Sequence, residues 1–429
     1  MSAKNKIQGI DLRDIAAKFG TPLYVYDAEK IKERIQYFKS CFSGINLNIK
    51  YAVKSLSNLN ILKLMKKEGL GLDTVTVQEI HLGLKAGFTP KQIVFTPNIT
   101  DFKNIKEAVE LGVSINIENL SNLEKFGKEF GSSIPCCIRL NPNILFEIEK
   151  REVEGIDRSN INKEHYDEIN EDRKSVWHNQ SKFGISLTQF KELMEIINSN
   201  NIKVNGLHIH ASHVIMNSEM FMKNAQTMFE LSKHFPYLEY FDFGGGLMVP
   251  HNENDKVVDI KTLGTEFEKL YKKYCHEQGV NYQIWFEPGR FLVSEAGYLL
   301  TTAEILKTNG SFDFVGVNTG FHHLIRPMMY DAYHEIINIS NPTGELKKYT
   351  VVGNLCEIDN LGKDRLLNKV SEGDILMVEN AGAYGFSMAS NYNSNYRPAE
   401  VLILNGEAKL IRKQESFIDV IKNIVEIDI

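Results

Sequence analysis

Short apolar runs alternate with amphipathic segments along most of this chain, from about residue 30 to residue 297. The amphipathic segments, such as Ile61-Leu62-Leu64-Met65, have apolar residues spaced three and four apart, which is typical of helices packed on a sheet. The apolar runs end near Val53, Leu72, Thr96, Ile117, Leu140, His210, Phe243 and Phe286. Eight strands with intervening helices over roughly 250 residues indicate a (β/α)₈ barrel. A doubly wound open sheet stays an alternative, because periodicity alone does not exclude it.

The pattern changes after residue 297, where strand-like segments separated by Gly and Asn turns replace the helical periodicity. We therefore predict a C-terminal, mostly β domain, either a barrel or a sandwich. The apolar segment Leu23-Tyr24-Val25-Tyr26 near the N-terminus is expected to complete it. The predicted division is a barrel domain of residues 30–297 and a β domain of residues 1–29 together with 298–429.

Composition excludes several classes of function. A formal net charge of −6 over 429 residues gives no general attraction for nucleic acid or for an anionic membrane. No apolar run is long enough to span a bilayer, and no signal-peptide core follows the first residues. The five cysteines are scattered, without the spacing of metal ligands. We therefore expect a cytoplasmic protein with free thiols and no metal site.

The segment of residues 143–180 interrupts the alternation after the fifth predicted strand and is dense in charge, as in Glu147-Ile148-Glu149-Lys150-Arg151-Glu152. A loop of this length in a compact domain is either functional or disordered. Its predicted position above the barrel's catalytic face favours a lid, with disorder as the alternative.

Polar residues stand at the C-terminal ends of the predicted strands, where barrel enzymes carry their active sites. They are Lys54, Asp73, Arg139, His208, His210, Gly244, Gly245, Gly246, Glu287 and Arg290. Each has an ordinary structural explanation as well: a surface lysine, a tight glycine turn, or a buried pair between Glu287 and Arg139 or Arg290. By strand alternation we expect only one of His208 and His210 to face the barrel interior.

Together these residue types match the needs of pyridoxal phosphate (PLP). Lys54, partly desolvated in a pocket, is expected to have a depressed pKa and to bind an aldehyde through its amine. The glycine triplet would offer backbone N–H groups to a phosphate. An imidazole would stack on the ring, and Glu287 would keep the pyridine nitrogen protonated so that the ring accepts electrons.

Specific motifs extend this interpretation over nearly the whole chain, from Phe19-Gly20-Thr21-Pro22 to Arg397-Pro398. The most specific are Tyr51-Ala52-Val53-Lys54, Lys182-Phe183-Gly184, Glu287-Pro288-Gly289-Arg290, Arg326-Pro327-Met328-Met329-Tyr330, Cys356-Glu357 and Ala381-Gly382-Ala383-Tyr384-Gly385. They resemble the fold-type III PLP-dependent decarboxylases, most closely the members that act on diaminopimelate. The resemblance implies that meso-2,6-diaminopimelate is decarboxylated to L-lysine and CO₂. Two alternatives are a related decarboxylase of ornithine, lysine, arginine or a carrier-bound amino acid, and a PLP-binding protein without catalysis.

The resemblance also implies a role for each matching residue. Lys54 would hold the cofactor covalently, His210 would stack on its ring and Glu287 would contact its ring nitrogen. The remaining cofactor-binding positions, most of them near the phosphate, would be Asp73, His213, Gly244, Gly245, Gly246, Gly289, Arg290 and Tyr384.

The substrate positions follow in the same way. Arg290, Arg326, Tyr330 and Tyr384 would bind the substrate, chiefly its carboxylate. Cys356, as proton donor, and Glu357, on the substrate's far amine, would reach into the site of a neighbouring subunit. The resemblance therefore implies a homodimer with shared active sites.

The chain departs from the family pattern at four places. Ser212-His213 replaces the usual Gly-Ser, Ile358 follows Cys356-Glu357 in place of Ser or Thr, and Asn318 replaces an aspartate. The fourth departure is the long charged segment of residues 143–180. All except the first are expected to surround the substrate.

Overall fold

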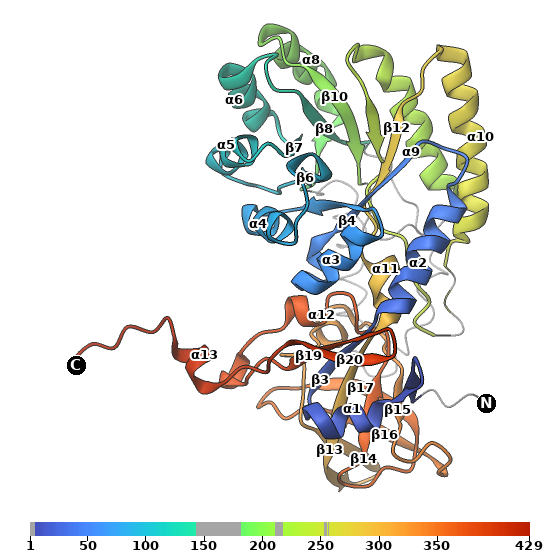
Figure 1. The fold of residues 1–429 in the computed structure, drawn as a ribbon, viewed down its shortest axis with the longest axis vertical. Helices are drawn as coiled ribbons and strands as arrows, with labels where there is room; N and C mark the ends of the chain where they lie inside the picture. The colour runs from blue at the N-terminus through green and yellow to red at the C-terminus, as the bar shows by residue number, and fades with distance from the viewer. Residues whose placement is uncertain (1–4, 143–181, 211–217, 253–254, 256) are drawn as a thin grey trace.

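The computed structural model describes residues 5–142, 182–210, 218–252, 255 and 257–429. These residues form a helix-covered barrel, in the upper half of Figure 1, and a β-rich part below it. The predicted lid at residues 143–180 lies outside the described residues, as do Ser212 and His213. Among the helices that are described, none has the length and apolar character needed to cross a membrane.

Eight parallel strands close into the predicted barrel. They are β4 (Leu47–Ala52), β5 (Gly71–Thr74), β6 (Ile93–Phe95), β7 (Ser114–Ile117), β8 (Cys136–Asn141), β10 (Val204–Ile209), β11 (Tyr240–Asp242) and β12 (Gln283–Phe286). The last strand pairs with the first, with Trp285 opposite Asn48, so the sheet has no open edge there. This closure confirms the (β/α)₈ barrel and excludes the open sheet. A short strand, β9 (Ile185–Ser186), extends β8.

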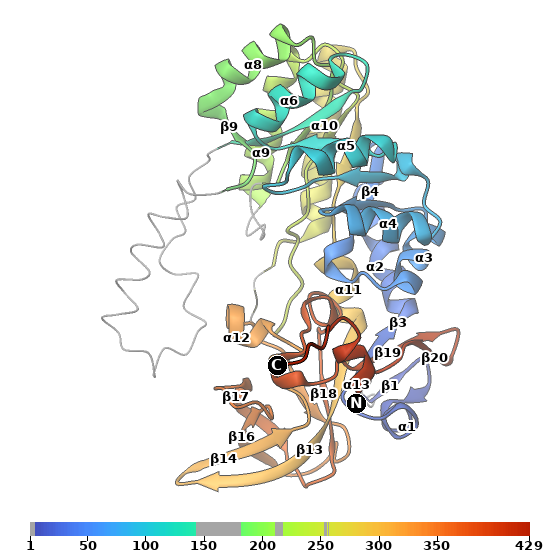
Figure 2. The ribbon, with the colours of Figure 1, turned by 90° about the vertical axis from the view of Figure 1, so that its left-hand side faces the viewer.

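Helices cover the outside of the barrel (Figures 1 and 2). They are α2 (Ala28–Cys41), α3 (Leu59–Lys67), α4 (Val77–Lys85), α5 (Phe102–Glu110), α6 (Leu120–Phe130), α8 (Phe190–Ser199), α9 (Ser218–Leu231) and α10 (Ile260–Gln278). Several begin at an Asp, Asn or Thr whose side chain accepts a backbone N–H of the first turn, as Asn58 does for α3. Phe42, Phe267 and Phe286 pack between strands and helices in the main apolar core.

The β-rich part contains one long sheet in the order β17-β16-β14-β13-β3-β19-β20, with β18 pairing β13 and β15. Its strands are β3 (Leu23–Asp27), β13 (Gly297–Asn309), β14 (Phe312–Val317), β15 (Ile336–Asn338), β16 (Leu346–Val352), β17 (Asn360–Asn368), β18 (Ile375–Val378), β19 (Ala399–Leu404) and β20 (Glu407–Arg412). β3 lies between β13, which is antiparallel to it, and β19, which is parallel. The domain boundaries drawn at residues 29 and 297 stay a prediction.

The remaining short elements flank these two parts. They are β1 (Lys6–Ile7), β2 (Ile10–Asp11), α1 (Leu12–Phe19), α11 (Arg290–Val293), α12 (Arg326–Tyr330) and α13 (Phe417–Ile421). Of these, α11 follows the last barrel strand and leads into β13 at the junction of the two parts (Figure 1).

A buried carboxylate, Glu400 of β19, links the two parts. Its Oε1 accepts a hydrogen bond from Tyr26 Oη of β3 at 2.8 Å, and its Oε2 accepts one from Asn58 Nδ2 at 2.9 Å. Arg412 also donates to Glu400 Oε2 and balances its charge. Because Asn58 caps α3, just after the barrel's first strand, this network fixes the sheet against the segment that carries Lys54.

Candidate active site

Lys54 lies in a 3₁₀ turn directly after β4, at the C-terminal end of the barrel. Its side chain is accessible to solvent but is lined by protein on most sides. Burial by itself lowers its pKa, but the neighbouring acidic groups of Asp73, Tyr384 and Glu287 outweigh that effect and raise it. The predicted depressed pKa is therefore wrong for this state of the protein, because the neighbouring strands bring carboxylates to the amine.

Asp73 is buried at the end of β5, and its Oδ1 lacks a hydrogen-bond partner among the described residues. Burial, reinforced by the charge of Glu287, raises the pKa of Asp73 to about 8.

The glycine triplet follows β11 and is held by two side chains. Gly244 N donates to Asp242 Oδ1 at 2.9 Å, and Gly245 N donates to His210 Nδ1 at 2.9 Å. Gly244 and Gly246 have positive φ angles, and a Cβ on Gly245 would lie 2.5 Å from the carbonyl oxygen of Glu287. The loop therefore requires glycine, but two of its N–H groups are bonded to protein acceptors.

Both histidines of β10 and its end face the site, so the expectation that only one does so is wrong. Strand side chains alternate with a period of two, so residues two apart share a face. His208 Nε2 lies 3.4 Å from Glu287 Oε2, and His210 contacts Gly245. Burial, with the charges of Arg139 and Lys54, lowers the pKa of His210 well below its usual value, so its ring is neutral.

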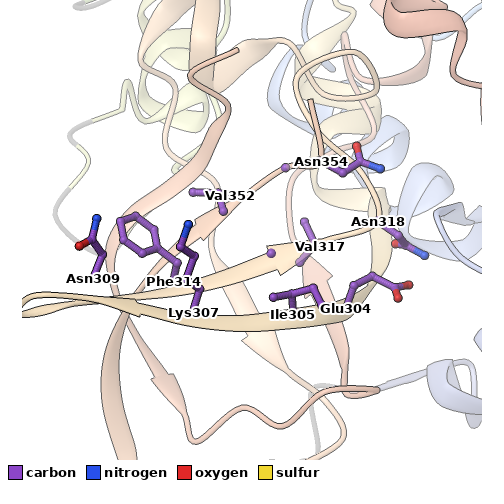
Figure 3. Close-up of a pocket in the computed structure, with 11 residues that line it drawn as sticks. Glu304, Ile305, Lys307, Asn309, Phe314, Val317, Asn318, Val352 and Asn354 are labelled. Atoms are coloured by element: carbon purple, nitrogen blue, oxygen red, sulfur yellow. The ribbon is translucent and has the colours of Figure 1, made fainter. Parts of the chain in front are cut away.

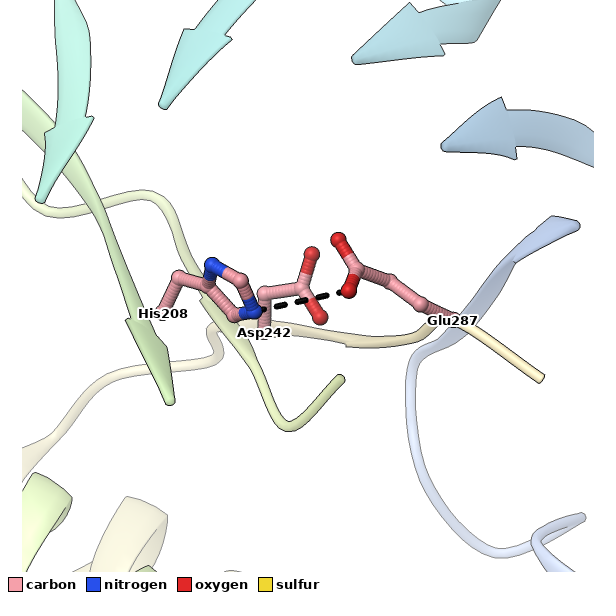
Figure 4. Close-up of side chains that lie close together, drawn as sticks. All are labelled: His208, Asp242 and Glu287. Atoms are coloured by element: carbon pink, nitrogen blue, oxygen red, sulfur yellow. Dashed lines mark ion pairs between the residues drawn. The ribbon is translucent and has the colours of Figure 1, made fainter. Parts of the chain in front are cut away.

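Glu287, at the end of β12, is buried beside His208 and Asp242 (Figure 4). His208 is the basic side chain within ion-pair distance of it, whereas Arg139 pairs with Glu118 at 3.6 Å and with Asn98 at 3.1 Å. One ligand atom from each of His208, Asp242 and Glu287 lies within 4.8 Å of the others, so this trio could by geometry hold a cation.

The predicted phosphate and substrate residues approach the same end of the barrel from α11, α12 and the loop after β18. Gly289 leaves no room for a side chain, because a Cβ there would lie 2.9 Å from Ser55 Oγ. Tyr384 N donates to the carbonyl of Ser55 at 2.9 Å, and the Arg290 guanidinium lies 5.6 Å from the Tyr384 ring centre. These contacts bring Gly289, Arg290 and Tyr384 next to the turn that carries Lys54.

Arg326 is buried and donates from Nε to Nε2 of His334 at 3.3 Å. His334 Nδ1 is 2.9 Å from the carbonyl oxygen of Glu379, to which it donates. Burial, with the charge of Arg290 nearby, lowers the pKa of Arg326 to about 10, and the guanidinium stays charged at neutral pH. Tyr330, at the other end of α12, is 58% exposed and contributes to the electrostatic surroundings of Arg326.

Cys356 and Glu357 lie on an exposed loop of the β-rich part. Their side chains contact Asn393 and Tyr392: Cys356 Sγ is 3.4 Å from Asn393 Oδ1, and Tyr392 Oη donates to Glu357 Oε1 at 2.8 Å. Neither contact involves a residue of the barrel, so the chain's own fold, as far as it is described, does not join this pair to Lys54. Ile358, next in sequence, is 75% exposed.

Asn318 forms a structural link, and the expectation that it surrounds the substrate stays a prediction. Its Oδ1 accepts from Thr301 Oγ1 at 2.7 Å and from Thr302 N at 3.0 Å. Its Nδ2 donates to the carbonyl and the hydroxyl of Thr21. An ionised aspartate could not donate these two bonds, so an amide at this position suits the packing of β13 against the N-terminal segment.

Two residues of the site, His334 and Asp242, were not predicted from the sequence. His334 gave no motif signal, because its contact with Arg326 is formed only in the folded chain. Asp242 did leave a signal: it is a charged residue inside the apolar run Phe241-Asp242-Phe243, directly before the glycine triplet. A buried carboxyl at such a position needs a local partner.

Comparisons with known proteins agree with this geometry. Residues 28–294 match the family model described as pyridoxal-dependent decarboxylase, pyridoxal binding domain. The diaminopimelate decarboxylase of Methanothermobacter thermautotrophicus is 32% identical over 97% of this chain and 94% of its own length. That of Bacillus subtilis is 31% identical over 97% of this chain and 94% of its own.

Solved structures lead to the same group. The diaminopimelate decarboxylase of M. jannaschii superposes with a TM-score of 0.84 at 29% identity, covering 99% of this chain and 97% of that one. The enzyme from Helicobacter pylori, complexed with L-lysine, gives a TM-score of 0.80 at 30% identity, with coverage of 96% and 98%. With matches over almost its entire length and a barrel that presents a lysine, a carboxylate and a glycine triplet together, the chain belongs to the family of pyridoxal-dependent decarboxylases.

Proposed function

We propose that this protein is a pyridoxal phosphate-dependent carboxy-lyase that converts meso-2,6-diaminopimelate to L-lysine and CO₂. The observation that carries the proposal is that Lys54, Glu287 and the glycine triplet meet at one end of the barrel. The full-length relatives named diaminopimelate decarboxylases support the choice of substrate.

The residues present suit the cofactor. Lys54 is accessible, and buried polar atoms around it, including Asp73 Oδ1 and Arg290 Nε, lack partners among the described residues. Gly245 and Gly289 have no room for a Cβ, so the backbone stays bare beside the turn that carries Lys54 and beside Glu287. A ligand that offers an aldehyde, a ring and a phosphate could use these groups together.

Four side chains at the end of the barrel would each contact a particular part of the cofactor. The Lys54 amine would hold the cofactor's aldehyde carbon, and Glu287 would hold a proton at the ring nitrogen. The neutral ring of His210 would lie against the cofactor ring, with Asp73 beside Lys54. When bound, the cofactor supplies an acceptor for the electron pair that departing CO₂ leaves on the substrate carbon.

The glycine triplet, Gly289, Arg290 and Tyr384 would face the phosphate, with Gly244 and Gly245 already positioned by Asp242 and His210. Arg326 and Tyr330 would bind a substrate carboxylate, assisted by Arg290 and Tyr384. Charged guanidinium groups suit this task because they pair with a carboxylate in a bidentate geometry.

We further propose a homodimer in which Cys356 and Glu357 complete the partner's site. Cys356 would deliver a proton to the substrate carbon, and Glu357 would bind the far amine. The β-rich part offers an apolar surface for such contacts: Phe312, Leu346 and Leu366 are each more than half exposed. An open groove of about 600 Å³ lies nearby, lined in part by Ile305, Phe314 and Val352 (Figure 3). The cytoplasmic location stays a prediction from the five free cysteines.

The direct test is CO₂ release by the PLP-loaded protein from meso-diaminopimelate, beside L-lysine, L-ornithine and L-arginine. We expect turnover of diaminopimelate alone, and none from Lys54→Ala. Turnover of another amino acid would move the proposal to that substrate. No CO₂ from any of them would favour a PLP-binding protein without catalysis.

The shared site has its own test. Lys54→Ala and Cys356→Ala dimers are each expected to be inactive, and mixing them should restore activity, because one of the two hybrid sites receives an intact lysine and an intact cysteine. Subunit exchange is followed separately with tagged chains. Complete exchange without recovered activity would rule out the contribution of Cys356 across the interface.

A further inference from the structure

Asp242 contacts two different parts of the candidate active site. It is the last residue of β11, and its side chain is completely buried. Its Oδ1 accepts a hydrogen bond from Gly244 N at 2.9 Å, which fixes the first residue of the glycine triplet. Its carboxyl also lies beside that of Glu287 (Figure 4), with one ligand atom of each no more than 4.8 Å apart.

The two carboxyls have too few donors to be ionised together. Asp242 Oδ2 and Glu287 Oε1 are both buried, and neither has a donor among the described residues. An unpaired buried carboxylate oxygen is unfavourable, and two adjacent like charges raise the pKa of one of the groups. A single proton between the two carboxyls would satisfy one oxygen of each and remove one negative charge.

The surroundings indicate which carboxyl holds that proton. Asn116 Nδ2, which can only donate, lies 3.3 Å from His208 Nδ1, so Nδ1 accepts and Nε2 carries the ring's proton toward Glu287. Burial would raise the pKa of Glu287, but His208, with His210 and Lys54, lowers it below its usual value. Burial and the charge of Glu287 raise the pKa of Asp242 well above its usual value.

We propose that Asp242 is a protonated positioning residue that donates from Oδ2 to Glu287 while its Oδ1 holds the glycine triplet in place. This inference rests on the proposed cofactor site and deepens it. One neutral side chain would connect the group that contacts the ring nitrogen with the loop that contacts the phosphate. Glu287 would still have acceptor capacity for the cofactor's ring N–H, because a carboxylate offers about four lone-pair positions.

The same trio could instead hold a divalent cation, and the hydrogen-bond directions argue against that arrangement. A metal ligand must present a lone pair, but His208 Nε2 carries a proton when Nδ1 accepts from Asn116. A cation is therefore an outcome to be tested rather than the favoured occupant.

The test compares Asp242→Asn with Asp242→Ala. Asparagine keeps the shape, an oxygen for Gly244 N and an N–H for Glu287, whereas alanine loses both contacts. PLP affinity is measured by titrating cofactor-free protein and following its fluorescence. We expect the asparagine variant to stay within about threefold of wild type and the alanine variant to bind on the order of tenfold more weakly, about the loss of one hydrogen bond.

A second readout separates positioning from general packing. The visible absorption of the bound cofactor responds to its protonation state and to the charges around it, and we expect a changed spectrum in Asp242→Ala but not in Asp242→Asn. If the alanine variant is unfolded by circular dichroism, retention of affinity and spectrum in the asparagine variant still supports a neutral Asp242.

Several outcomes would overturn the proposal. Equal loss of affinity in both variants would mean that Asp242 acts as an anion, and wild-type behaviour of Asp242→Ala would mean that it positions nothing. One equivalent of metal in wild-type protein, absent from Asp242→Asn by elemental analysis, would establish a cation site. If wild-type protein itself binds no PLP, the proposed cofactor site fails, and the role of Asp242 fails with it.

Discussion

The contact between His334 and Arg326 gives a prediction that two matched substitutions can test. His334 is completely buried; its Nε2 accepts from Arg326 Nε at 3.3 Å, and its Nδ1 donates to the carbonyl of Glu379 at 2.9 Å. Burial lowers the pKa of His334 to about 3, so the ring is neutral at neutral pH and Nε2 keeps its lone pair. Glutamine can replace Nε2 with its side-chain oxygen, and asparagine can replace Nδ1–H with its amide.

Each variant therefore loses one of the two hydrogen bonds. His334→Gln keeps the acceptor for Arg326 and loses the bond to Glu379, whereas His334→Asn does the reverse. A hydrogen bond to a charged group contributes about 1.5–3 kcal/mol, and at 3.3 Å we take the lower value. If Arg326 binds a carboxylate that does not react, this loss raises KM about tenfold and leaves kcat unchanged.

The assay is steady-state CO₂ release with diaminopimelate, accompanied by the free energy of unfolding of each variant. Both variants should lose similar stability, since each leaves one buried group unpaired, but only His334→Asn should lose apparent substrate affinity. A wild-type KM in His334→Asn would refute the reasoning. So would an equal rise of KM in the two variants, because the glutamine variant keeps the contact with Arg326.

Two further predictions follow from buried positions. Gly245→Ala would place a Cβ 2.5 Å from the Glu287 carbonyl oxygen, so we expect overpacking to lower the free energy of unfolding by about 1–3 kcal/mol and to weaken PLP binding. The control is Gly316→Ala, whose Cβ would have no neighbour closer than 3.5 Å and which should bind PLP like wild type. Burial, with His322 beside it, lowers the pKa of His323 from 6.5 to about 3, so below pH 6.5 the unfolded chain binds a proton that the folded chain does not. Stability should fall by about 1.4 kcal/mol per pH unit from this residue as the pH drops from 6.5 toward 3, and His323→Gln should flatten the measured dependence of the unfolding free energy on pH. An unchanged slope in that variant would contradict the neutral, buried state of His323.

The barrel was predictable because its signal is repeated. Each of the eight apolar runs ends on a polar residue or is followed by a polar residue or a glycine turn, and parallel strands bring these residues to one end. Lys54, Glu287 and the glycine triplet could be placed there without knowledge of side-chain contacts. Their mutual arrangement follows from topology alone.

What was missed depends on contacts between strands that are far apart in sequence. The pKa of Lys54 is raised because β5 and β12 bring Asp73 and Glu287 close to it, and no local pattern records those charges. The two histidines differ from this case, because a local rule places them: residues two apart in a strand share a face, so His208 and His210 both face the site. The link between His334 and Arg326 depends on tertiary packing, which periodicity does not report.

The position of β3 between β13 and β19 has a consequence for synthesis on the ribosome. Tyr26 of β3 must wait for Glu400 of β19, 374 residues later in the chain, before their hydrogen bond can form. At about 5–20 residues per second, that delay is on the order of 20–75 s. Until β13 is made, the nascent chain carries an apolar strand with both edges unpaired, and the edge that β19 later covers stays unpaired for the whole interval. An unpaired strand edge is a template for intermolecular pairing. We therefore expect the yield of native protein to depend on what shields residues 23–27 while the rest is translated, and a chain truncated before β19 to aggregate through this strand.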